Sequence, residues 1–225
     1  MGRYEDIYAG HAAAYDELVR HEDHEGNLAR FLLGAVQWDG KRVLEPGAGT
    51  GRVTAIYQER AGSVLLADRS AHMLDVARAR FGSRVRFAIC ENLALASLGG
   101  QYDVVIEGWS FGHTVTDGAE RLEETVDALV AACLGLLAPG GAVVLIETLG
   151  SGVAAPGAPN ETLRRFYQHL EERHGFARTT LSTEYRFASA EEAARITGFF
   201  FGPEFSARVR SRDVPEFTGV WLKRT

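Results

Sequence analysis

The sequence predicts an α/β fold in which a seven-stranded, mostly parallel sheet lies between two layers of helices. Three observations support this prediction. Five short β-rich runs alternate with stretches of helical periodicity between residues 41 and 147, a glycine-rich turn follows the first run, and the end of the chain alternates like a closing pair of antiparallel strands. Strands that alternate with helices form parallel sheets whose right-handed crossovers cover both faces. With 225 residues, of which 46% are hydrophobic, the chain fits one domain.

Two helices are expected before the first strand. Apolar residues near helical spacing run from Ile7 to Val19, and a second helical pattern covers residues 27–36. Ser70 stands where it can cap the helix that follows the second strand. In chain order, the expected strands are 41–46, 63–68, 84–89, 102–107 and 141–147, and the helices expected between them are 51–60, 70–81 and 120–138.

After residue 149 the pattern loosens. Residues 150–161 are rich in Gly, Pro and Ala, which predicts a linker or hinge. The elements expected beyond this linker are a helix that carries Leu163, Phe166, Tyr167 and Leu170, an extended piece near Tyr185, a helix from about Ser189, and a strand pair over 204–211 and 218–224.

The composition narrows the functional classes. A formal net charge of −6 opposes the broad basic surface of a nucleic-acid-binding protein. The two cysteines, Cys90 and Cys133, lie in apolar segments, which indicates reduced thiols. The longest nearly uncharged helical stretch, residues 128–138, is shorter than the roughly 20 residues that a membrane-spanning helix needs, and residues 1–10 lack the apolar run of a secretory signal. We therefore expect a cytoplasmic protein, a monomer or homodimer, whose partner is a small molecule.

The stretch VLEPGAGTGRVT, residues 43–54, places three glycines on alternate positions behind the first strand. Glycine permits a positive φ angle and a close approach of a ligand to the backbone. A dinucleotide-binding loop needs its third glycine where this chain has Arg52, and the Lys-Ser/Thr pair of a P-loop does not follow. A carboxylate such as Glu45 would repel a pyrophosphate at about 4 Å by about 1 kcal/mol in water and about 4 kcal/mol at an effective dielectric of about 20. The loop therefore favours a cationic or zwitterionic nucleoside.

With these motifs the sequence resembles the class I (Rossmann-like) S-adenosylmethionine (SAM)-dependent methyltransferases. The resemblance rests on LEPGAGTG, LLADRSAHML, CENLA, YDVVIE and LLAPGGAVVLIE, which occur in the family's order and cover residues 40–150. It implies a three-layer Rossmann-like fold, SAM as the cofactor and S-adenosylhomocysteine as the product. The beginning, YAGHAAAYDELV, and the end, FTGVWLKR, look like the branch that methylates small molecules. The domain would then divide into an N-terminal helical lid (1–38), a cofactor-binding core (39–149), an insert or lid (150–200) and closing strands (201–225).

The resemblance also implies roles for individual residues. Glu45 would reach the methionine amino group of SAM, and Asp68 would bind the ribose hydroxyls, since a carboxylate offers two acceptors to a vicinal diol. The adenine contact is open, because Cys90-Glu91-Asn92 stands where the family usually has Gly-Asp-Ala. The residues that the resemblance assigns to the cofactor are Tyr15, Glu45, Gly47, Ala48, Gly49, Gly51, Asp68, Arg69, Met73, Glu91 and Asn92.

Several of these residues have a purely structural alternative. Met73 could pack in the core of a helix instead of beside the adenine. Tyr15, which shares a helix face with Tyr8, could be a core residue instead of closing over the cofactor.

The methyl acceptor is expected beyond the fourth strand, because ligands of open α/β sheets gather at the carboxyl ends of the strands. There the sequence EGWSFGHT offers Glu107, Trp109 and His113 as catalytic or pocket residues. The ordinary pKa of histidine suits His113 as a general base, although a packed residue at a helix entry is the alternative. Trp109 could line the acceptor pocket or fill the core. The stretch lacks the Asn/Asp-Pro-Pro-Tyr signature of many base and glutamine N-methyltransferases.

The sequence thus predicts a SAM-dependent methyltransferase that acts on an O or N atom of an unidentified small molecule. A SAM-binding protein that is noncatalytic or catalyses a non-methylating reaction is the alternative, and a NAD-dependent oxidoreductase ranks last. No metal is expected, because His21 and His24 in RHEDHEG fit a solvated turn.

Overall fold

The computed structural model describes residues 10–225. Ile7 and Tyr8 of the first expected helix lie outside this range. The seven-stranded sheet has the order β3-β2-β1-β4-β5-β9-β6. Strands β1 to β5 run parallel to one another, whereas β9 is antiparallel to both of its neighbours, β5 and β6. The strands of this sheet are β1 (Arg42–Pro46), β2 (Ser63–Asp68), β3 (Arg86–Ile89), β4 (Tyr102–Gly108), β5 (Leu137–Ser151), β6 (Ala177–Ser182) and β9 (Glu216–Arg224).

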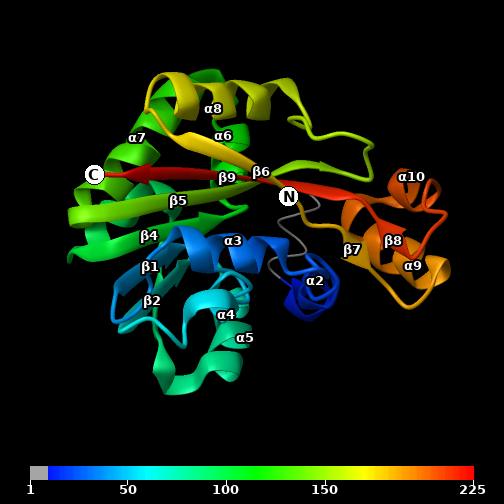
Figure 1. The fold of residues 1–225 in the computed structure, drawn as a ribbon, viewed down its shortest axis with the longest axis horizontal. Helices are drawn as coiled ribbons and strands as arrows, with labels where there is room; N and C mark the ends of the chain where they lie inside the picture. Colours follow the sequence, from blue (N-terminus) through cyan, green and yellow to red (C-terminus); the bar gives the residue numbers. More distant parts are fainter. Residues whose placement is uncertain (1–9) are drawn as a thin grey trace.

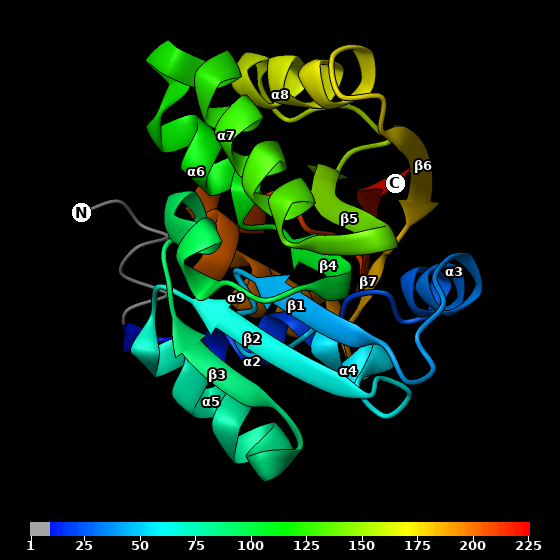
Figure 2. The ribbon, with the colours of Figure 1, turned by 90° about the vertical axis from the view of Figure 1, so that its left-hand side faces the viewer.

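Helices form one layer on each face of the sheet, as Figure 2 shows. Helices α6, α7 and α8 cover one face, and α3, α4 and α5 cover the other. None of the helices described over residues 10–225 is long and apolar enough to span a bilayer. The helices are α2 (Ala12–Val19), α3 (Asn27–Ala35), α4 (Thr54–Tyr57), α5 (Ala71–Phe81), α6 (Phe111–Asp117), α7 (Leu122–Gly135), α8 (Glu161–Glu172), α9 (Ala190–Phe201) and α10 (Pro203–Ser206).

The sheet is buried on both faces, which explains its nearly continuous apolar strands. In β5, Val143 and Leu145 join the core under α7, while Val144 and Ile146 join the core under α3 and α4. The α5 helix starts as the sequence predicts, because the Ser70 hydroxyl accepts a hydrogen bond from Met73 N at 3.3 Å. The predicted α/β architecture, with five parallel strands and a closing antiparallel pair, is confirmed.

A small lobe lies beyond the carboxyl ends of the parallel strands (Figure 1). It consists of α9, α10 and the two-stranded sheet of β7 (Tyr185–Arg186) and β8 (Asp213–Val214). Its own core includes Tyr185, Ile196 and Phe205, and Leu18 of α2 packs into the same cluster. The lobe and α2 therefore stand together over the edge of the sheet where a ligand would enter.

Two sequence predictions about individual elements are wrong. Residues 204–211 do not form a strand; they contain α10 and a loop, because Gly202 and then Pro203 at the first helical turn start a helix there. The partner of β9 is instead β6, which pairs with it from Ala177↔Leu222 to Ser182↔Phe217. The helix expected over 51–60 contains only Thr54–Tyr57 as α-helix.

Candidate active site

A cavity of about 760 Å³ lies where the strand order changes direction. The chain runs outward from β1 to β3 on one side and from β4 to β5 on the other, so the loops after β1 and β4 diverge at this point. Side chains from α2, α9 and α10 line the opposite side of the cavity. In Figure 1 this is the region between the carboxyl ends of the parallel strands and the small lobe.

The glycine loop forms one wall of the cavity with its backbone. Gly47 and Gly49 line the cavity and have φ angles of +63° and +54°. A Cβ atom on Gly47 would lie 1.9 Å from Ser110 Oγ, so the loops after β1 and β4 touch only because Gly47 has no side chain. Ala48 and Gly51 face away from the cavity: Ala48 is buried, and Gly51 packs against Phe81.

Asp68 lies at the carboxyl end of β2 and lines the cavity. Its Oδ2 accepts a hydrogen bond from Gly49 N at 2.8 Å, and its Oδ1 accepts one from Ser70 N at 2.8 Å. Burial raises the pKa of Asp68, although these two backbone donors oppose the change. Arg69 and Met73 line the same part of the cavity. The structure therefore fixes a carboxylate beside the glycine loop and leaves each of its oxygens a further lone pair.

The three residues after β3 all line the cavity: Cys90, Glu91 and Asn92. The Asn92 amide is already engaged, since its Nδ2 donates to Thr114 Oγ1 at 3.0 Å and to Ser110 Oγ at 3.3 Å. Asn92 thus links the loop after β3 to the start of α6.

Glu45 does not line the cavity, contrary to the sequence prediction. It is fully buried, and its Oε2 accepts hydrogen bonds from Thr54 Oγ1 at 2.7 Å and from Tyr57 OH at 2.5 Å. Burial raises the pKa of Glu45 to about 7, so its carboxyl group is only partly ionised at neutral pH. The side chain turns under α4, where it anchors the turn that follows the glycine loop.

Glu107 likewise lies beneath the site instead of in it. Its Oε1 accepts hydrogen bonds from Ser110 N at 2.5 Å and from Phe111 N at 3.0 Å, and these contacts hold the start of α6. Burial raises the pKa of Glu107 to about 7. We therefore correct its predicted catalytic placement: Glu107 supports the loop that carries Trp109 and His113.

Trp109 and His113 both line the cavity. Trp109 adopts a φ angle of +56°, a left-handed conformation that is rare for a bulky residue and that turns its ring toward Arg52. Burial lowers the pKa of His113, which keeps its imidazole neutral at pH 7. Tyr15, from α2, also lines the cavity and packs its ring against Phe200 of α9, with 5.8 Å between the centroids.

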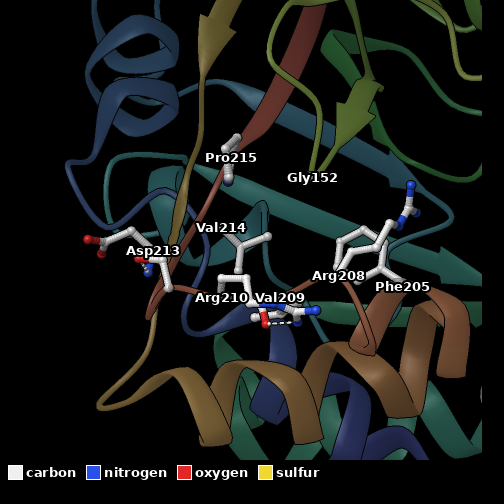
Figure 3. A pocket seen from close by; sticks show the side chains of 9 residues that line it. Gly152, Phe205, Arg208, Val209, Arg210, Asp213, Val214 and Pro215 are labelled. Carbon is white, nitrogen blue, oxygen red and sulfur yellow. Dashed lines mark hydrogen bonds between the residues drawn. The ribbon is translucent and has the colours of Figure 1, made fainter.

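A second, smaller hollow of about 200 Å³ lies between α10 and β8 (Figure 3). Phe205 and Arg208 line both hollows. Its one carboxylate, Asp213, is paired with Arg186 at 2.7 Å. The larger cavity therefore remains the candidate site.

Residues 43–141 match the family model described as a methyltransferase domain. This segment of the chain is therefore similar to a methyltransferase domain. The match spans β1 to the start of β5 and includes the glycine loop and Asp68. A search of curated protein sequences found no match.

Solved structures share the fold of this chain at low sequence identity. The YcgJ protein of Bacillus subtilis superposes with a TM-score of 0.59 at 12% identity, over 88% of this chain and 98% of that one. Precorrin 8W decarboxylase of Methanobacterium thermoautotrophicum gives 0.56 at 13% identity, over 89% and 90%. Phosphoethanolamine N-methyltransferase 2 of Haemonchus contortus, solved with phosphomonomethylethanolamine and S-adenosylhomocysteine, gives 0.52 at 17% identity, over 89% and 52%. At such identities the likeness establishes the fold alone.

Sequence reasoning missed seven charged residues that line the cavity: Glu22, Arg52, Asp117, Glu147, Glu204, Arg208 and Glu216. Arg52 forms an ion pair with Glu22, and its guanidinium stacks on Trp109 at 3.7 Å from the ring centroid. One signal for Glu147 was present, because the runs VLEP, VVIE and VLIE each place a glutamate near a strand end. The pairing of Arg52 with Glu22 joins distant segments, and no local pattern reveals it.

One cluster outside the cavity brings histidine and carboxylate ligand atoms together. Among residues 10–225, Asp127, His169 and His174 alone form such a group of three. Asp127 Oδ1 lies 2.8 Å from His169 Nε2 and 2.7 Å from His174 Nε2. These contacts link α7 to α8 and to His174, which follows α8. His21 and His24 instead contact β7 and the residue before it: His21 Nδ1 lies 2.9 Å from the Arg186 carbonyl oxygen, and His24 Nε2 lies 3.3 Å from Glu184 Oε1.

Proposed function

We propose that the protein is a SAM-dependent methyltransferase that transfers a methyl group to an O or N atom of a small molecule. The observation that carries this proposal is the carboxylate of Asp68, held by two backbone N–H groups beside an exposed glycine backbone. That arrangement suits a ribose next to a ligand that must lie close to the loop. It is found within the segment that matches the methyltransferase family.

The residues present fit SAM in shape and in chemistry. Gly47 and Gly49 offer bare backbone to the cavity, and a Cβ atom on Gly49 would press on Met73 Cε at 3.2 Å. Asp68 keeps acceptor capacity for hydroxyl groups, while Met73 offers an apolar surface beside it. When bound, SAM supplies an electrophilic methyl group: the acceptor's lone pair forms the new bond to carbon, and the electrons of the broken carbon–sulfur bond stay on sulfur.

The chain's own contribution is positioning and the exclusion of water. Alignment of the reactants in a direct displacement can lower the barrier by roughly 7 to 11 kcal/mol. We assign closure of the site to α2 with Tyr15 and to the lobe with Phe200, which pack on each other above the cavity. His113 is held neutral by burial, so its imidazole can take a proton from an acceptor hydroxyl or amine.

A noncatalytic SAM-binding protein is the alternative, and it requires side chains that block the space beyond the fourth strand. The cavity continues past Trp109 to Glu147 and Glu216. This open, polar extension favours an enzyme with a second substrate.

The proposal is tested by calorimetric titration of the full chain with SAM, S-adenosylhomocysteine and NAD. We expect both SAM and S-adenosylhomocysteine to bind and NAD not to bind. Binding of NAD together with no response to either sulfur nucleoside would overturn the proposal. A screen of small acceptors for S-adenosylhomocysteine production then separates the enzyme from a noncatalytic binder.

A further inference from the structure

The part of the cavity that Glu22, Glu147, Glu216 and Arg52 line holds more carboxylates than cations. Glu22 forms an ion pair with the buried guanidinium of Arg52, which also stacks on Trp109. Glu216, at the start of β9, is near enough for the charge of Glu22 to raise its pKa. Two acidic side chains therefore share one guanidinium at this wall.

Only one of the two carboxylate oxygens of Glu216 has a hydrogen-bond partner among the described residues. Its side chain is 2% exposed, and its Oε1 accepts a hydrogen bond from Thr148 Oγ1 at 2.9 Å. Its Oε2 is buried and has no hydrogen-bond partner among the described residues 10–225, although the residue lines the cavity. Buried polar atoms are nearly always paired in native proteins, so an orphaned carboxylate oxygen at a cavity wall points to a ligand that donates to it.

Glu147 adds a second acid from the neighbouring strand. It lies one residue before Thr148 on β5, lines the cavity, and its Oε1 accepts a hydrogen bond from Gly112 N at 2.6 Å. Burial and the nearby Glu107 carboxylate raise the pKa of Glu147. Within residues 10–225, neither Glu147 nor Glu216 forms a salt bridge with a lysine, arginine or histidine.

We propose that the methyl acceptor is a small molecule with a basic amine, bound as the ammonium ion by Glu216 Oε2, with an apolar body packed against Trp109 and Leu163. The apolar part follows from the same cavity, because Trp109, Leu163 and Phe200 line it beside the two acids. This inference rests on the proposed methyltransferase function and narrows its acceptor from any O or N atom to an amine nitrogen.

The same carboxylate can prepare the amine for reaction. Burial and the charge of Glu22 raise the pKa of Glu216 to about 8, while the Ser151 and Thr148 hydroxyls and Arg52 offset only part of this rise. A carboxylate with such a pKa can take a proton from a bound ammonium ion, which leaves a free lone pair on nitrogen. After methylation the nitrogen carries the positive charge again, and the proton held on Glu216 Oε2 leaves to water. One proton is therefore released for each methyl group transferred.

The test compares amines with alcohols of the same carbon skeleton. The full chain is saturated with S-adenosylhomocysteine and titrated calorimetrically with 2-phenylethylamine against 2-phenylethanol, and with cyclohexylmethylamine against cyclohexylmethanol. At least one amine should bind about tenfold or more tightly than its alcohol, because the charge-assisted hydrogen bond is lost with the charge. Failure of both amines to exceed their alcohols, including the absence of any binding, overturns the inference.

A variant pair assigns the effect to Glu216. Glu216→Gln should weaken amine binding about tenfold to a hundredfold, and it should leave S-adenosylhomocysteine affinity unchanged, which also shows that the variant is folded. Glu204→Gln is the matched control, because Glu204 is an exposed acid at the rim of the same cavity and should have no effect. Equal loss in both variants, or no loss in Glu216→Gln, contradicts the assignment. If the wild type does not bind S-adenosylhomocysteine at all, the proposed function fails before the amine question arises.

Discussion

The substitution Asp68→Asn probes the feature on which the proposed cofactor site depends. Each carboxylate oxygen of Asp68 already accepts one backbone N–H at 2.8 Å, from Gly49 and from Ser70. Each oxygen therefore keeps about one lone pair for a ribose hydroxyl. Asparagine removes the charge and one of these acceptors, and it sets an NH₂ group against a backbone N–H.

The expected loss is one charge-assisted hydrogen bond, about 1.5 to 3 kcal/mol, which corresponds to roughly a 10- to 150-fold weaker affinity for S-adenosylhomocysteine. Calorimetry measures the affinity, and thermal unfolding of the ligand-free proteins separates lost contacts from a disturbed loop. The matched control is Asp75→Asn, an exposed residue on α5 that pairs with Arg78 at 2.6 Å and should not change the affinity. An Asp68→Asn protein that unfolds like the wild type and binds S-adenosylhomocysteine equally well would refute the ribose assignment.

Three further predictions concern the same architecture. Gly47→Ala should lower the free energy of unfolding by about 2 kcal/mol or more, because its Cβ would lie 1.9 Å from Ser110 Oγ. The double variant with Ser110→Gly should recover part of the loss. Equal stability of Gly47→Ala and the wild type in urea would contradict the prediction. The pKa of Glu45 is raised to about 7 in the folded state, whereas the unfolded state releases this proton above about pH 4.5, so the free energy of unfolding should fall as pH rises from about 5 to 8. Glu45→Gln should reduce this fall by about 1 to 3 kcal/mol. An unchanged dependence of the free energy of unfolding on pH would contradict the prediction. The pKa of Asp103 shifts the other way, because Arg42 lowers it to about 2. The ionised carboxylate therefore contributes about 1 kcal/mol to stability above about pH 4, and this contribution is lost toward pH 2. Asp103→Asn should destabilise the protein at pH 7 and much less at pH 2.

The order of strands and helices could be predicted from the sequence because periodicity is a local property. Residues 63–68 form β2 as expected, and Ser70 caps α5 through its own hydroxyl. The pairing of β9 could not be predicted in the same way. Residues 204–211 alternate as well as a real strand, and only the Gly202–Pro203 turn and the contacts of β6 decide the outcome.

Part of the candidate site could likewise be predicted from the sequence, and part could not. Backbone-defined features, such as Gly47 and the strand-end Asp68, lie where the motif puts them. The direction of a strand-end side chain could not be predicted, because hydrogen bonds from Thr54 and Tyr57 hold the Glu45 side chain beneath α4. The position of Glu216 at the cavity could not be predicted from the sequence either, because it follows from the pairing of β9 with β5.

The position of β9 inside the sheet has a consequence for how the protein is made. Among the strands described over residues 10–225, β6 has one sheet neighbour, β9, which occupies residues 216–224. During synthesis β6 therefore leaves the ribosome before its partner strand, which follows it by more than thirty residues. The finished sheet, and the place of Glu216 at the cavity, can form only once residues 216–224 have emerged.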